Sequence, residues 1–253
     1  NELTWHFYAP NVHDFAWAAD RDYTHEIYQV PDGPKVHILY IKSPKTSHWD
    51  IMGKETVESI EWLNKHVGTY PYKQYSVIQG GDGGMEYPMC TLINGEESER
   101  SLIGTMTHEL THNWFYGVLG SNESLYPFMD EGFTTHFSSK MMKDVYGGPE
   151  NPLLGSYLGY LNIKYHKLEE PSITHADRFE TNYAYGISSY SKPAAFLDQL
   201  SYIIGEKNFE KGIKRYFKTW KFKHPDPHDF KRVMEKQSGM ELDWYFRFWL
   251  HST

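Results

Sequence analysis

Residues 107–112 read THELTH and contain two histidines and one glutamate in an HExxH spacing. On a helix, a four-residue spacing places His108 and His112 on one face, one turn apart. Their neutral ring nitrogens are suitable zinc donors at about 2.0 to 2.1 Å. Glu109 is offset around the helix and can hold the water molecule that completes the coordination. The segment therefore predicts a zinc site that still needs a third protein ligand.

A third candidate ligand follows in the next predicted helix. The HExxH pattern can arise by chance in a chain with 14 histidines, so its surroundings must decide. Glu131 lies nineteen residues after His112, in the segment MDEGF, where a short connection folds one helix back against the other. Two histidines and one carboxylate leave a fourth position open, as catalytic zinc requires. We expect His108, His112 and Glu131 to bind one zinc ion.

Three separated motifs resemble those of one enzyme family. HExxH, a gap of eighteen residues and a glutamate is the pattern of the gluzincin zinc aminopeptidases related to aminopeptidase N and the leukotriene hydrolase. Upstream, residues 83–87 (GGMEY) resemble the family's GxMEN segment, and downstream, residues 190–192 (YSK) resemble its YxKG segment. The resemblance spans residues 1–253 and implies a fragment that contains the catalytic domain of a bacterial member.

The resemblance implies substrate-binding roles for the residues around GxMEN. It makes Glu86 the carboxylate that holds the free α-amino group of a peptide, and a carboxylate opposite an ammonium is the right chemical partner. Gly83, Gly84 and Met85 belong to the same segment, where glycines allow an extended peptide to approach the backbone closely. The alternative interpretation of Glu86 is a solvated acid in a loop.

Two tyrosines are implied as active-site residues. Tyr190 matches the phenol that donates a hydrogen bond to the oxyanion formed when water attacks the peptide carbonyl. Tyr185 matches another active-site tyrosine of some relatives. Packing in the core is the alternative, because the chain contains 20 tyrosines. In the implied mechanism, Glu109 accepts a proton from the attacking water and passes it to the leaving amine.

Four positions depart from the commoner family pattern. Tyr87 replaces the Asn of GxMEN, Pro193 replaces the Gly after YxK, and Asp130 replaces the Asn before the third ligand. Ser138 stands where many relatives carry an acid two turns after that ligand. The residue that orients a metal-bound histidine is therefore not identified by the motif. His136 and Asp130 are candidates, although an exposed helix face is the alternative for both.

The elements that must position these residues are mostly helices. Apolar residues at helical spacing, with glycine or proline at the ends, predict helices over 54–67, 101–115, 127–145, 193–204, 209–220, 228–237 and 242–250. Residues 75–78 read as a strand that leads into a glycine-rich stretch. The expected fold class is α+β, mostly helical, with the small strand-containing lobe and larger helical lobe of a thermolysin-like catalytic domain.

Residues 1–42 contain short apolar runs between turn residues, including 4–8 and 15–18, which are typical of strands. We expect residues 1–42 to be the C-terminal end of a preceding β-rich domain, and residues 43–253 to be the catalytic domain. The chain would then pack against an N-terminal β domain that is missing from the sequence.

Composition excludes several other classes of protein. The 253 residues are 40% hydrophobic, enough for a substantial core. A formal net charge of −8 disfavours a nucleic-acid partner. We expect no membrane segment, because no run of eighteen or more apolar residues occurs. The partners expected are peptides with a free N-terminus, and both the cytoplasm and the periplasm remain open as locations.

The leading prediction is a zinc aminopeptidase that removes N-terminal residues from peptides. A thermolysin-like endopeptidase has the same metal helix, but would not need Glu86 to bind a free amino group. A non-catalytic peptide-binding or scaffold relative is another alternative, against which the complete set of catalytic residues argues. An epoxide hydrolase side activity occurs in one relative, and no feature of this sequence requires it.

Overall fold

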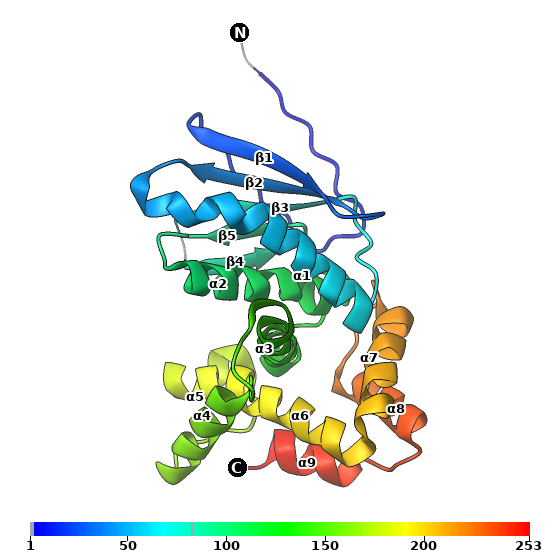
Figure 1. Ribbon diagram of the computed structural model, residues 1–253. Coiled ribbons are helices and arrows are strands. Elements are labelled where there is room, and N and C mark those ends of the chain that lie inside the picture. Colours follow the sequence, from blue (N-terminus) through cyan, green and yellow to red (C-terminus); the bar gives the residue numbers. More distant parts are fainter. Residues whose placement is uncertain (1–2, 82) are drawn as a thin grey trace.

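The computed structural model describes residues 3–81 and 83–253, which form one sheet and a larger set of helices (Figure 1). The strands form a single five-stranded sheet in the order β1-β2-β3-β5-β4. They are β1 (Tyr23–Gln29), β2 (Lys35–Ile41), β3 (Gln74–Gln79), β4 (Gly84–Tyr87) and β5 (Cys90–Ile93).

Helices make up the chain after β5, and the first helices of the chain lie between β2 and β3. The α-helices are α1 (Met52–His66), α2 (Glu99–His112), α3 (Phe133–Tyr146), α4 (Leu154–Tyr165), α5 (Asn182–Gly186), α6 (Lys192–Ile204), α7 (Glu206–Trp220), α8 (Pro227–Ser238) and α9 (Asp243–His251). Shorter helical turns are η1 (Pro44–Ile51), η2 (Asn113–Val118), η3 (Phe128–Gly132), η4 (Ala176–Arg178) and η5 (Ile187–Ser191).

The sheet is mixed and ends at β4. Strands β1 and β2 pair antiparallel, β2 pairs parallel with β3, β3 parallel with β5, and β5 antiparallel with β4. Alternate residues of β2, namely Val36, Ile38 and Tyr40, are buried, as expected for a strand with one face against helices. Among the described residues β4 is the last strand in the order, so its outer edge has no neighbouring strand, and an extended peptide can add at such an edge.

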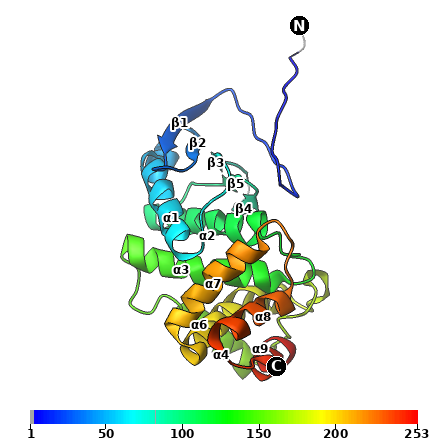
Figure 2. The ribbon, with the colours of Figure 1, turned by 90° about the vertical axis from the view of Figure 1, so that its right-hand side faces the viewer.

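Helices α1 and α2 lie against the sheet, and the remaining helices lie beyond them (Figures 1 and 2). Helix α1 contacts β1 and β2, whereas α2 contacts β4 and β5. Helix α2 buries Leu102, Met106 and Leu110 at helical spacing, and each such side chain contributes about 1.5 to 3 kcal/mol on burial. This packing holds the other face of α2 toward the helical lobe.

The expected helices are present, with ends that shift by a few residues, but some elements were not predicted. Strands β4 and β5 and helix α4 are additional. Helix α4 escaped prediction because Leu154, Leu158 and Leu161 remain exposed, so its apolar residues do not mark one buried face. The strands expected over 4–8 and 15–18 are wrong: these residues are in no strand, and Trp5, for example, is exposed.

The sheet continues across the expected boundary at residue 42. Strand β2 ends at Ile41 and pairs with β3, which follows α1. The division into residues 1–42 and 43–253 therefore falls within one sheet, and it stays a prediction. Among residues 3–81 and 83–253, no helix combines the length and apolar character that are needed to cross a bilayer.

Candidate active site

The HExxH segment forms the last two turns of α2, as predicted. The helix begins after Ser98, whose hydroxyl accepts a hydrogen bond from the backbone N–H of Ser101 at 3.4 Å. His108 and His112 project from the same face, and their ring centroids are 4.8 Å apart. After His112 the chain widens into the π-helical turn η2, a feature that is frequent at functional sites.

Glu131 reaches these histidines from the π-helical turn η3. The turn packs against the start of α6, and Gly132 makes this close approach possible. A Cβ atom at Gly132 would lie 2.4 Å from Cβ of Pro193, well inside van der Waals contact. The absent side chain at Gly132 thus allows η3 to bring the Glu131 carboxylate over the end of α2.

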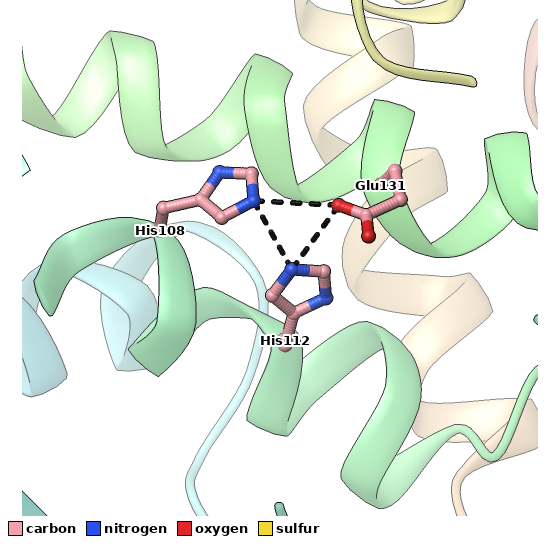
Figure 3. A group of neighbouring side chains, drawn as sticks. All are labelled: His108, His112 and Glu131. Atoms are coloured by element: carbon pink, nitrogen blue, oxygen red, sulfur yellow. Dashed lines mark hydrogen bonds and ion pairs between the residues drawn. The ribbon is translucent and has the colours of Figure 1, made fainter. Parts of the chain in front are cut away.

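The three candidate ligand atoms form a small triangle (Figure 3). His108 Nε2 lies 3.1 Å from His112 Nε2, and Glu131 Oε2 lies 3.3 Å from each of them. Tetrahedral zinc with bonds of about 2.0 to 2.1 Å requires ligand atoms roughly 3.3 to 3.4 Å apart. The side chains therefore fit one zinc ion in both donor type and spacing.

Asp130 lies behind His112 and orients its ring. Asp130 is fully buried, and His112 Nδ1 lies 2.6 Å from Asp130 Oδ1. A proton on Nδ1 that is donated to this carboxylate leaves Nε2 free for a metal. Of the two candidates considered from sequence, His136 does not take this role, because its Nδ1 instead contacts the carbonyl oxygen of Ala194 at 3.2 Å.

Asp130→Ala should lower zinc affinity about tenfold to a hundredfold, because the His112 ring loses the partner that fixes its tautomer and orientation. Competition with a chelator measures this affinity. Ser138→Ala is the matched control on α3, since the Ser138 hydroxyl bonds only to the carbonyl oxygen of Thr135 among the described residues. Equal zinc affinities for the two variants would show that Asp130 does not position His112 for metal binding.

Glu109 is buried beside the triangle and has a free oxygen. The residue is 8% exposed, and its Oε2 has no hydrogen-bond partner within the described part of the chain. Burial raises the pKa of Glu109 to about 8, opposed by the charge of His112 and reinforced by Glu86. A carboxylate with a high pKa and an unused oxygen is suited to accept a proton from water.

Gly84 gives Glu109 the space that it occupies. A Cβ atom at Gly84 would lie 2.4 Å from Glu109 Oε1 and 3.1 Å from Thr105 Cγ2. Gly84→Ala should therefore displace the Glu109 carboxylate and lower kcat by roughly tenfold to a hundredfold, with zinc still bound. Gly83→Ala is the control, because no atom lies within 4 Å of a Cβ there. Steady-state kinetics would contradict this prediction if both variants kept the parental kcat.

Glu86 lies on β4, near the Nδ1 atom of His112. It is 8% exposed, and its Oε1 lies 4.0 Å from His112 Nδ1. Burial raises the pKa of Glu86 to about 7, with opposition from His112 and reinforcement from Asp130. The expected substrate-binding residues Gly84, Met85 and Glu86 line one pocket with the metal triangle, whereas Gly83 precedes the strand and is not among the lining residues.

Both predicted tyrosines also face this pocket. Tyr190 belongs to the π-helical turn η5, and its ring is nearly parallel to that of His108 at 6.0 Å. Burial and the Glu131 charge raise the pKa of Tyr190, so the phenol keeps its proton. The ring of Tyr185 lies 6.2 Å from that of Tyr190.

The pocket that these residues line has a volume of about 330 Å³. Its lining combines the predicted site residues with residues of the segment between η2 and η3 and with the first residue of η4. The lining residues are Gly84, Met85, Glu86, His108, Glu109, His112, Glu123, Ser124, Pro127, Glu131, Ala176, Tyr185 and Tyr190.

Two acids near the site were missed from sequence. Lys192 Nζ donates to Glu169 Oε1 at 2.6 Å and to the carbonyl oxygen of Ser252 at 3.0 Å, and both members of this ion pair are buried. The pair fixes the start of α6 two residues after Tyr190. Glu123 lines the pocket itself. No motif marked either acid.

Comparison with solved structures identifies the fold. The crystal structure of an M1 zinc metallopeptidase from Deinococcus radiodurans superposes with a TM-score of 0.72 at 19% identity, over 91% of this chain and 51% of that chain. The shared architecture is the mostly helical α+β fold that was expected. The fold is thus that of M1 zinc metallopeptidases.

Sequence relationships assign the family. Residues 54–249 match the peptidase family M1 domain, and the chain belongs to this family. Leucine aminopeptidase 2 of Neurospora crassa is 26% identical over 237 residues, which cover 83% of this chain and 34% of that protein. Aminopeptidase N of Streptomyces lividans is 23% identical, over 90% of this chain and 29% of that protein.

The chain thus spans about a third of the length of these curated relatives. Because the relatives are both fungal and bacterial, the expected bacterial origin stays a prediction.

Proposed function

We propose that this chain carries the catalytic site of a zinc aminopeptidase that removes N-terminal residues from peptides. The observation that carries the proposal is the triangle of His108 Nε2, His112 Nε2 and Glu131 Oε2 with the Glu86 carboxylate beside it. His108, His112 and Glu131 would hold one zinc ion, which when bound polarises the scissile carbonyl and lowers the pKa of water. The names of the M1 relatives support peptide substrates.

The proposed mechanism assigns proton movement to Glu109. Its buried carboxylate accepts a proton from the attacking water and then gives this proton to the nitrogen of the leaving amine. Tyr190 donates a hydrogen bond to the oxygen of the attacked carbonyl as negative charge develops there. A phenol that keeps its proton can make this interaction throughout the reaction.

Substrate binding is assigned to β4 and its acid. The outer edge of β4, which has no neighbouring strand in the described part of the chain, offers backbone groups to an extended peptide. Glu86 pairs with the α-ammonium group and so positions the first peptide bond next to the metal triangle. Tyr185 forms part of the wall that faces the substrate.

A second and larger cavity, next to the N-terminal segment and the sheet, supports the proposal that another domain packs there. It has a volume of about 690 Å³ and is lined mainly by residues 7–18 and by the sheet residues of β2 and β3. The side chains of Trp5, Phe7 and Trp17, which belong to this N-terminal segment, are exposed. The relatives are about three times longer than this chain. The proposal is that an N-terminal β-rich domain of the whole protein covers these aromatic residues, with residues 1–42 as its end.

One peptide in free and N-acetylated forms tests the proposed activity. The zinc-loaded chain should remove residues stepwise from the free peptide and leave the acetylated peptide intact, because acetylation abolishes the cation that Glu86 binds. Mass spectrometry identifies the products. Internal cleavage of both peptides at equal rates would contradict the aminopeptidase proposal and favour an endopeptidase of thermolysin type.

A further inference from the structure

The pocket contains one more carboxylate than the proposed mechanism uses. Glu86, Glu109 and Glu131 have roles in amine binding, proton transfer and metal binding, whereas Glu123 has none. Among the described residues, neither lysine nor arginine lines this pocket. Glu109 Oε2 is also buried there without a hydrogen-bond partner in the described chain. The pocket thus presents an excess of negative groups to whatever enters it.

Glu123 is held on an ordered loop. The Leu125 backbone N–H donates to Asn122 Oδ1 at 3.0 Å, which closes a turn around Glu123. The Ala176 N–H donates to the carbonyl oxygen of Ser124 at 2.9 Å and ties this turn to η4, whose first residue also lines the pocket. These bonds fix the backbone on both sides of Glu123 and keep its half-buried side chain at the pocket wall.

No lysine or arginine lies within ion-pair distance of the Glu123 carboxylate in the described part of the chain. Across residues 3–81 and 83–253, its side chain makes neither a hydrogen bond nor an ion pair. Burial raises the pKa of Glu123, the negative charges of Glu86 and Glu131 add to this effect, and His112 opposes it. A cation placed between these acids would relieve their repulsion and satisfy the unused acceptor.

We infer that Glu123 binds the cationic side chain of an N-terminal arginine or lysine, which makes the pocket selective for basic N-terminal residues. This inference rests on the proposed aminopeptidase function. Glu86, only 4.0 Å from His112, suits the α-ammonium group, which is two bonds from the scissile carbonyl carbon. Glu123 lines the same pocket but forms neither a hydrogen bond nor an ion pair with a candidate metal ligand among the described residues, so its carboxylate suits a charge at the end of a long side chain.

The test uses two dipeptides that differ only in side-chain charge. Arginyl-alanine and citrullinyl-alanine have nearly the same shape, but only the first carries a guanidinium group. The zinc-loaded chain should show a kcat/KM for the arginyl peptide at least about tenfold higher. In Glu123→Gln the ratio should approach one, because kcat/KM for the arginyl peptide should fall toward the value for the citrullinyl peptide. Asp177→Asn is the control for long-range charge and should keep the ratio, because its side chain is 90% exposed.

A binding measurement separates this inference from the proposed function. Calorimetry with arginine amide and citrulline amide should show the same preference for the cation and the same loss in Glu123→Gln. If neither dipeptide is hydrolysed, the proposed function is contradicted. The ratio of the affinities for arginine amide and citrulline amide then decides whether Glu123 binds the cationic side chain. Equal binding and equal rates for both ligands would overturn it. A variant that weakens both equally would assign Glu123 to the α-ammonium group and would also overturn it.

Discussion

Glu109→Gln is expected to leave zinc bound and to lower kcat by about a hundredfold to ten-thousandfold. The amide is nearly isosteric with the carboxylate, so the pocket keeps its shape, but it cannot accept a proton from water. The unused Glu109 Oε2 lies in the same pocket as the metal triangle, which is where this proton must be received. Steady-state kinetics on a free peptide, with zinc content measured on the same sample, checks the prediction.

The control for this variant is Glu61→Gln, which makes the same chemical change on the exposed surface of α1. It should keep the parental kcat and zinc content. If Glu109→Gln also turned over normally, Glu109 would not be the base. If it lost its zinc instead, Glu109 would be required for the metal site, and loss of rate would say nothing about proton transfer.

His112→Ala should abolish tight zinc binding and also destabilise the fold. The variant removes one of three candidate ligands, so zinc affinity should fall by more than the roughly hundredfold upper limit for loss of an outer partner. It also leaves the fully buried Asp130 without its partner, which should lower the free energy of unfolding by about 3 to 5 kcal/mol. Chelator competition and denaturant unfolding measure the two effects.

His136→Ala separates the loss of zinc affinity from the loss of stability. His136 is also fully buried on α3, and burial lowers its pKa to about 3, so it is a neutral side chain that contacts the Ala194 carbonyl. This variant should be destabilised but should retain zinc affinity. If His112→Ala proves unstable, His112→Ala combined with Asp130→Ala removes the unpaired acid and keeps the metal measurement possible. Unchanged zinc affinity in either His112 variant would exclude His112 as a ligand.

Much of the site could be predicted because its chemistry depends on local spacing. The two histidines of HExxH are one helical turn apart on any helix, and the structure places them together with Glu131. The eighteen residues between His112 and Glu131 gave a distance along the chain but not the geometry. The π-helical turn η3 and the missing side chain of Gly132 decide that geometry, and neither has a periodic pattern.

The residues around the ligands were harder to predict because their roles depend on tertiary contacts. Asp130 could be named as a candidate beside His136, but only the fold shows which of them faces His112. Glu123 lies in a loop without a motif, and its place in the pocket depends on the hydrogen bond from the Ala176 N–H to the carbonyl oxygen of the neighbouring Ser124, more than fifty residues away in sequence. Sequence spacing carries no signal for such a contact.

The fold shows the same division between local and long-range information. The amphipathic pattern of α1 predicted its extent within two residues, because its buried face is continuous. Strands β4 and β5 are four residues each and lie next to glycines, so their apolar pattern was too short to recognise. The aromatic run near Trp5 and Phe7 resembled a strand, yet these side chains are exposed, consistent with the proposal that another domain covers them.

Anomalous diffraction at the zinc absorption edge, from crystals of the zinc-loaded chain, tests the central claim most directly. The account predicts one peak within about 2.0 to 2.2 Å of His108 Nε2, His112 Nε2 and Glu131 Oε2, with a fourth position open toward the pocket. A peak at any other group of side chains, or no peak at this triangle in zinc-loaded crystals, would contradict it.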